Sequence, residues 1–122
     1  MDLLQIDAPY PRSTAELEAA LPSEAVLDEA VTLLKGFANP TRLKILLLLR
    51  EGEVCVHQIV EVLAMTQSAV SHQLRTLRSA RLVAFTKRGR HVYYRLDDDH
   101  VRHLFSEGLA HVQHAGDGRT HG

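Results

Sequence analysis

Residues 66–82 read TQSAVSHQLRTLRSARL, and this stretch decides how the rest of the sequence is interpreted. Val70, Leu74 and Leu77 recur at helical spacing, which predicts an amphipathic helix whose apolar stripe packs on a core. Thr66 is its expected N-cap. The other face is polar, and it suits hydrogen bonds to base edges from a helix lying in a DNA major groove. The predicted DNA-contacting residues on this face are Gln67, Ser68, Ser71, His72 and Arg75.

The charge pattern separates a DNA-binding helix from an ordinary solvated amphipathic helix, which has the same periodicity. The whole chain carries 14 Lys and Arg and 15 Asp and Glu, for a net charge of −1. Residues 66–96 nevertheless contain no acidic residue and seven of the Lys and Arg residues. A solvated surface normally mixes both signs, so this segregation predicts a face that binds phosphates. It also argues against the alternative of a protein-interaction module with no role on DNA.

Composition predicts one globular, mainly helical domain. The 122 residues are 45% hydrophobic and 24% charged but only 5% aromatic, which is typical of an aliphatic helical core. A single Cys excludes an intrachain disulfide framework and a thiolate-rich metal centre within one chain. No apolar run reaches the length of a membrane span and the start of the chain lacks a signal-peptide pattern, so we expect a cytoplasmic protein with no membrane partner.

Turn signals divide the chain into three predicted parts, which are an arm with a possible short helix over residues 1–20, a domain over 21–114 and a flexible tail over 115–122. The domain should contain helices at 22–38, 40–52 and 55–64, the second capped by Asn39 and the third with Cys55 and Gln58 at capping-box positions. The helix at 40–52 is apolar nearly all round and should lie at the centre. The helices at 55–64 and 66–82 form a helix-turn-helix pattern.

After residue 82 the apolar period changes from 3.6 to 2. The alternation from Val83 to Leu96 predicts a β-hairpin, and its cationic tip should contact backbone phosphates beside the groove. The predicted contacts at the tip are Lys87, Arg88 and Arg90. The fold class is therefore mostly α with a small β-hairpin, a winged helix-turn-helix. The last helix carries a broad apolar stripe in which Gly108 permits close approach of another helix, so we expect a homodimer through the terminal helices.

Four of the eight histidines fall on the last predicted helix. His100 and His111 share a face, yet eleven residues of helix separate them by about 16 Å, so one chain cannot bring both to one ion. An antiparallel copy of the helix can. Asp98 and His100 would then meet His111 and His114 of the partner subunit, a donor set that suits tetrahedral Zn²⁺, whereas further ligands would favour Ni²⁺ or Co²⁺. Pairing of His103 with His114, or histidines that only face solvent, are the alternatives.

The sequence argues against an enzyme, because it has no HExxH metal motif, no nucleophile elbow and no glycine-rich phosphate loop.

From about Phe37 to His114 the sequence resembles the ArsR/SmtB metal-sensing repressors. The segments that carry the resemblance are FANPTRLKILLLL, EVCVHQI, QSAVSHQLRTLRSARLV, GRHVYYRL and the spacing Asp98-x-His100-x₁₀-His111-x₂-His114. The resemblance implies a dimeric winged helix-turn-helix repressor that holds its operator DNA when metal-free and releases it when metal binds. It also implies an inter-subunit site on the last helix, with Zn(II) as the sensed effector, or Ni(II) or Co(II) if a ligand such as His121 is added.

The family's other common site uses thiolates near EVCVHQI. Cys55 matches the first thiolate, but His57 stands where a second Cys occurs in some members, and Gln58 where zinc sensors often have Asp. We therefore expect Cys55 to be a small buried residue, His57 to be solvated, and His72 and His91 to lie near DNA phosphates. A winged-helix regulator that responds through the Cys55 thiol or a protein partner, without metal, is the alternative.

Overall fold

The computed structural model describes residues 10–118, with side chains up to residue 114. Predictions that concern residues 1–9 and 119–122, His121 among them, lie outside the described residues. The chain divides into two units, residues 1–31 and 32–122, which are described separately. The first contains α2 (Thr14–Ala19) and the beginning of α3 (Glu24–Lys35). Ser13 caps α2 by accepting a hydrogen bond from the Glu16 N–H at 3.1 Å.

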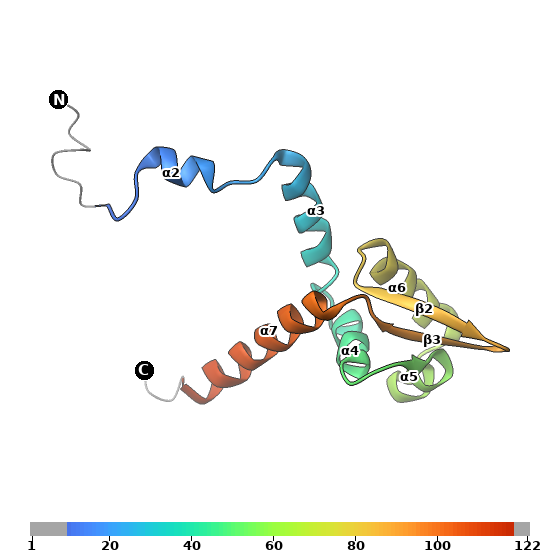
Figure 1. Ribbon diagram of the computed structural model, residues 1–122. Helices are drawn as coiled ribbons and strands as arrows, with labels where there is room; N and C mark the ends of the chain where they lie inside the picture. Colours follow the sequence, from blue (N-terminus) through green and yellow to red (C-terminus); the bar gives the residue numbers. More distant parts are fainter. Residues whose placement is uncertain (1–9, 119–122) are drawn as a thin grey trace, which may run out of the picture. The chain divides into compact units, whose positions relative to one another are not determined.

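The second unit has the predicted winged helix-turn-helix architecture (Figure 1). After the end of α3 its elements are α4 (Pro40–Leu49), β1 (Val54–Cys55), α5 (Val56–Leu63), α6 (Gln67–Ser79), β2 (Val83–Arg88), β3 (His91–Leu96) and α7 (Asp99–Gly118). The helix-turn-helix is α5 and α6, and the β2–β3 hairpin is the wing. No helix among the described residues is long and apolar enough to cross a membrane.

The core of this unit forms around α4, as predicted. Ile45, Leu46 and Leu49 are completely buried, and they pack with the apolar stripe of α6 predicted from the sequence. The sequence placed the stop of this helix at Gly52, whereas α4 ends at Leu49 with Arg50 as its C-cap, and Gly52 follows with a φ of +153°. Leu43 is 36% exposed, because it faces away from the core.

Two of the three predicted helix caps of this unit are present. Asn39 accepts a hydrogen bond from the Arg42 N–H at 3.1 Å, and Thr66 accepts one from the Ala69 N–H at 3.1 Å. The capping box predicted at Cys55 is wrong, because the Cys55 side chain makes no cap hydrogen bond. At the other end of the chain, α7 runs to Gly118, four residues beyond its expected end at His114.

The sheet has one strand more than the sequence predicted. Its order is β1-β3-β2, all antiparallel, with Val54 opposite Tyr94 and Cys55 opposite Tyr93. A two-residue strand is too short to show an alternating pattern, so β1 could not be found from periodicity. The wing turn is tight, with Gly89 at a φ of +61° and Arg90 at negative φ, as in a type II′ hairpin turn.

Leu74 is 1% exposed, so Leu74→Ala should lower the free energy of unfolding by about 2–5 kcal/mol. Urea unfolding followed by circular dichroism at fixed protein concentration measures this. Val62→Ala is the matched control, because Val62 is 64% exposed and its truncation should change stability by no more than about 0.5 kcal/mol. Equal destabilisation by the two substitutions would contradict the assignment of Leu74 to the core.

Candidate functional site

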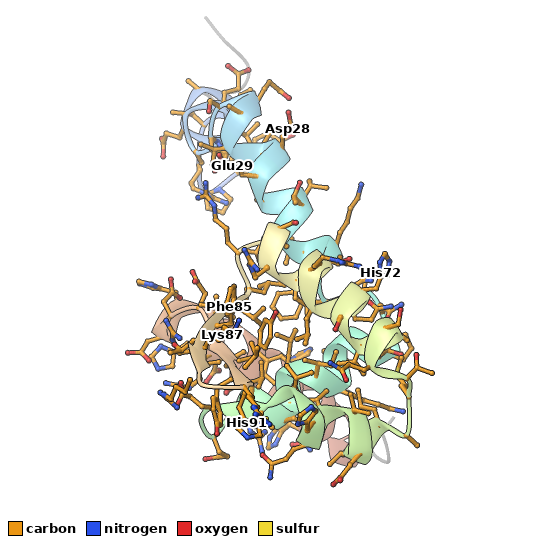
Figure 2. All side chains as sticks on the ribbon, turned by 90° about the vertical axis from the view of Figure 1, so that its right-hand side faces the viewer. Asp28, Glu29, His72, Phe85, Lys87 and His91 are labelled. Carbon is orange, nitrogen blue, oxygen red and sulfur yellow. The ribbon has the colours of Figure 1, made fainter. Side chains whose placement is uncertain are left out.

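The start of α6 presents the polar face predicted from the sequence. Since α6 buries Val70, Leu74 and Leu77, its opposite face remains open. Gln67, Ser68, His72 and Arg75 are exposed there and Ser71 is half-buried. In Figure 2 the side chain of His72 points away from the helix. The structure thus gathers all five predicted residues on α6, and their contact with DNA stays a prediction.

Arg42 joins α6 to the end of α3. Its guanidinium donates to the Gly36 carbonyl through Nε at 3.1 Å and to the Lys35 carbonyl through Nη2 at 3.2 Å. These carbonyls lie at the C-terminal end of α3, where helix carbonyls lack partners within the helix. Through Nη1 it also donates to the Gln73 Oε1 on α6 at 3.2 Å. Arg42, whose role no local pattern in the sequence indicates, therefore links α4 to the candidate recognition helix α6.

The wing carries Lys87, Arg88 and Arg90, and all three side chains are exposed (Figure 2 labels Lys87). Arg88 is nevertheless engaged within the chain, since its Nη2 lies 2.9 Å from the Glu53 carboxylate and its guanidinium stacks 4.9 Å from the Tyr93 ring centroid. A phosphate at Arg88 has to compete with that carboxylate. Sequence reasoning missed this pair because the partners are 35 residues apart.

Two other arginines of residues 66–96, here called the basic segment, stabilise the position of the wing. The Arg78 guanidinium of α6 lies 4.5 Å from the Phe85 ring centroid on β2, a cation–π contact. Arg95 on β3 donates to the Thr86 hydroxyl on β2 at 2.9 Å. Part of the positive charge that predicted a phosphate-binding face therefore fixes the hairpin against α6.

The predicted metal ligands Asp98 and His100 lie at the start of α7, and His111 and His114 lie in its second half. Asp98 Oδ1 accepts a hydrogen bond from the Val101 N–H at 2.9 Å and lies 3.8 Å from His100 Nδ1, so these two residues can reach one ion. The His100 side chain is 98% exposed, and His111 and His114 are also exposed. The described chain brings Asp98 and His100 together and leaves the other pair about 16 Å away along the helix.

A different set of ligands converges within one chain. Among the described side chains, one group of three or more Cys, His, Asp or Glu residues has its ligand atoms within 4.8 Å of one another, and it consists of Cys55, His57 and His91. The Cys55 Sγ lies 3.8 Å from His91 Nδ1. Cys55 is half-buried, His57 is exposed as expected, and Figure 2 shows His91 beside α5. The sequence alone predicted only that His91 lies near DNA, because β1 and its register leave no pattern along the chain.

Comparison with known proteins agrees with the winged helix-turn-helix fold of the second unit. Residues 39–84 match the family model described as "Bacterial regulatory protein, arsR family". The HTH-type transcriptional regulator NmtR of Mycobacterium tuberculosis is 45% identical over 96 residues, which cover 79% of this chain and 79% of that protein. The chain belongs to the ArsR family. It is therefore related to DNA-binding transcriptional regulators and is not an enzyme, as the sequence predicted.

Two solved structures of similar proteins extend the comparison. One is the solution structure of a homodimeric winged helix-turn-helix DNA-binding domain from Mycobacterium bovis, with 36% identity, a TM-score of 0.67, and coverage of 80% of this chain and 90% of that one. The other is the antimony-specific transcriptional repressor AntR, with 31% identity, a TM-score of 0.70, and coverage of 90% of this chain and 94% of that one. The fold of this ArsR-family chain is thus one found in DNA-binding domains.

An apolar groove beside α7 is left open in this ArsR-family chain. It encloses about 370 Å³ and is lined by residues that include Leu34, Phe37, Leu43, Leu104 and Val112. Leu34 is 55%, Leu104 47% and Val112 66% exposed. Contiguous apolar surface of this kind marks a protein contact. Gly108 also lines the groove, and a Cβ there would meet nothing within 4 Å.

Replacing Lys87 or Arg90 with Ala should weaken operator binding. It should also reduce the slope of log association constant against log salt by about 0.9 for each phosphate that is no longer neutralised. Arg88→Ala should reduce the slope less, because Glu53 already neutralises that cation. Fluorescence anisotropy of labelled operator DNA over a salt series measures both quantities. Lys44→Ala, on the exposed side of α4, is the matched control. Unchanged slopes in both Lys87→Ala and Arg90→Ala would contradict the role of the wing.

Proposed function

We propose that this chain is a homodimeric repressor that releases its operator DNA when Zn(II) joins the α7 helices of the two subunits. The observation that carries the proposal is the arrangement of α7, which has exposed potential ligands at its start and in its second half and an uncovered apolar groove beside it. A second subunit that is related by a two-fold axis can cover the groove. Its α7 then runs antiparallel to the first, with the start of one helix beside the second half of the other. Asp98 and His100 then face His111 and His114 of the partner subunit.

The contacts of α7 with the core support coupling between metal and DNA. Arg102 on the first turn of α7 donates to the Arg50 carbonyl, at the C-terminal end of α4, at 3.2 Å. Phe105 is 4% exposed and stacks on Phe37 with ring centroids 6.2 Å apart. A shift of α7 would therefore displace the C-terminal end of α4. The N-terminal end of α4 contacts α6 through the hydrogen bond from Arg42 to Gln73.

The coupling is the free energy by which metal changes the affinity for DNA and DNA changes the affinity for metal. In the proposed mechanism, metal favours an arrangement of the dimer in which the two α6 helices no longer match major grooves about 34 Å apart. Metal then lowers the affinity for DNA, and DNA lowers the affinity for metal by the same factor, about 5–150-fold for typical couplings. Only different affinities of each ligand for the two arrangements can produce this effect.

Zinc is the preferred ion because three imidazoles and one carboxylate suit tetrahedral coordination. Nickel or cobalt at the same site is the second candidate. It requires extra ligands, for which the exposed His103 on α7 is a candidate. Direct metal analysis of the purified protein, with the visible spectrum of its cobalt-substituted form, separates four-coordinate from six-coordinate sites.

Dimerisation through the groove is tested by Leu104→Glu. Leu104 is 47% exposed in the single chain, so the substitution should leave the monomer folded while placing a charge in the dimer contact. Sedimentation equilibrium should show conversion from dimer to monomer. Val62→Glu, at a 64% exposed position on α5 outside the groove, should remain dimeric. A dimeric Leu104→Glu protein would contradict this interface.

The metal site is tested with the double substitution His111→Ala and His114→Ala. The variant should keep its metal-free operator affinity and lose the zinc-dependent decrease of about 5–150-fold. Fluorescence anisotropy with and without zinc measures this. Gln113→Ala, between the two histidines, should behave as the unaltered protein. A normal zinc response in the double variant would overturn the site, and loss of the response in His103→Ala alone would favour the alternative pairing.

A further inference from the structure

An ion pair between Arg88 and Glu53 joins the wing to the segment that leads into β1. Arg88 Nη2 lies 2.9 Å from Glu53 Oε1 and 3.1 Å from Oε2. The guanidinium also stacks on the Tyr93 ring, 4.9 Å from its centroid, so two contacts fix its position. Arg88 ends β2 beside the wing turn, which is predicted to meet the DNA backbone. In this conformation its charge is nevertheless directed to a carboxylate of the same chain.

The backbone of Glu53 is fixed through both of its neighbours. The Gly52 N–H donates to the Leu49 carbonyl, at the end of α4, at 3.3 Å. On the other side, Val54 is paired with Tyr94 in the sheet. The Glu53 side chain is 33% exposed, so it is partly withdrawn from solvent. Its negative charge therefore stays beside the wing whether or not DNA is present.

Arg88 is the partner that can change its contact. Its side chain is 56% exposed, and it is longer than that of Glu53. A guanidinium presents its N–H donors in a planar fork that fits a carboxylate and a phosphate equally well. Both anions therefore use the same donors, and they repel each other. Full contact of Arg88 with a DNA phosphate requires that it leave Glu53.

We propose that Glu53 limits the affinity of the metal-free protein for DNA, because it competes with a backbone phosphate for Arg88. The proposal rests on the predicted contact of the wing with DNA, and it does not depend on zinc or on the α7 site. Since ion pairs accessible to solvent are weak, release of Arg88 should tighten DNA binding about two- to fivefold. Phosphate contacts carry no sequence information, so Glu53 lowers the affinity for every DNA sequence by the same factor.

Glu53→Gln tests the proposal, because it removes the charge and keeps the shape of the side chain. The probes are a fluorescein-labelled duplex that the unaltered protein selects from a random-sequence pool, and an unrelated duplex of the same length. Without metal, both affinities from fluorescence anisotropy should rise about two- to fivefold. The slope of log association constant against log salt should steepen by up to about 0.9, the value for one phosphate. Circular dichroism checks that the variant is folded.

Two further variants show whether the effect passes through Arg88. In a protein that already carries Arg88→Ala, Glu53→Gln should give no gain in affinity, because the group for which the anions compete is absent. Glu51→Gln is the matched control, since it removes the same charge two residues away. Glu51 is 87% exposed and pairs with Arg50 at 3.5 Å instead of with the wing, so its substitution should leave affinity and salt slope nearly unchanged.

Several results would overturn the proposal. An equal gain from Glu53→Gln with and without Arg88 would show only a long-range effect of net charge. Weaker binding by Glu53→Gln would mean that the carboxylate orients Arg88 toward phosphate. A gain confined to the selected duplex would contradict a contact with the backbone. If Lys87→Ala and Arg90→Ala change the salt slope and Glu53→Gln does not, the wing meets DNA and this proposal alone fails.

Discussion

Burial of α4 is the constraint on which the other elements of the winged-helix unit depend. Ile45, Leu46 and Leu49 are completely buried, and α4 contacts both α6 and β3. Both ends of the same helix carry directed polar contacts, from Arg42 to Gln73 on α6 and from the carbonyl of its C-cap residue to α7. The helix that would contact DNA and the helix that would hold metal are thus positioned by one buried element. Since packed cores resist continuous deformation, the proposed movement of α7 at one end would be transmitted to α6 at the other.

The basic segment serves two purposes, and the structure separates them. Arg78 on α6 contacts the Phe85 ring on β2, and Arg95 on β3 donates to Thr86 on β2. Both arginines therefore stabilise the hairpin. The side chains of Lys87 and Arg90 at the wing tip are exposed. A count of positive charges in the sequence therefore overstates the number available for phosphates. The absence of acidic residues between residues 66 and 96 still marks this face as the candidate for phosphate binding.

Local signals in the sequence were sufficient for the helices and the wing. Asn39 and Thr66 act as caps through their own neighbours, and the stripe of α6 follows from its periodicity. Contacts between distant residues were not predictable in this way. Glu53 pairs with Arg88, 35 residues away, only because β1 joins the sheet, and a two-residue strand leaves no pattern to detect. The same strand aligns Cys55 with β3, which is why the Cys55, His57 and His91 group could not be found from spacing along the chain.

The two sets of candidate ligands are positioned by different forces. The two pairs of ligands on α7 meet only if two subunits associate, so their affinity for metal depends on the free energy of dimerisation and on protein concentration. Cys55 and His91 are positioned by backbone hydrogen bonds of the sheet and His57 by the first turn of α5, all within one chain, so their affinity for metal does not include that term. Dilution should therefore weaken the first set and spare the second. In a regulator with both, metal at the first site would act on the dimer, whereas metal at the second would stabilise each wing separately.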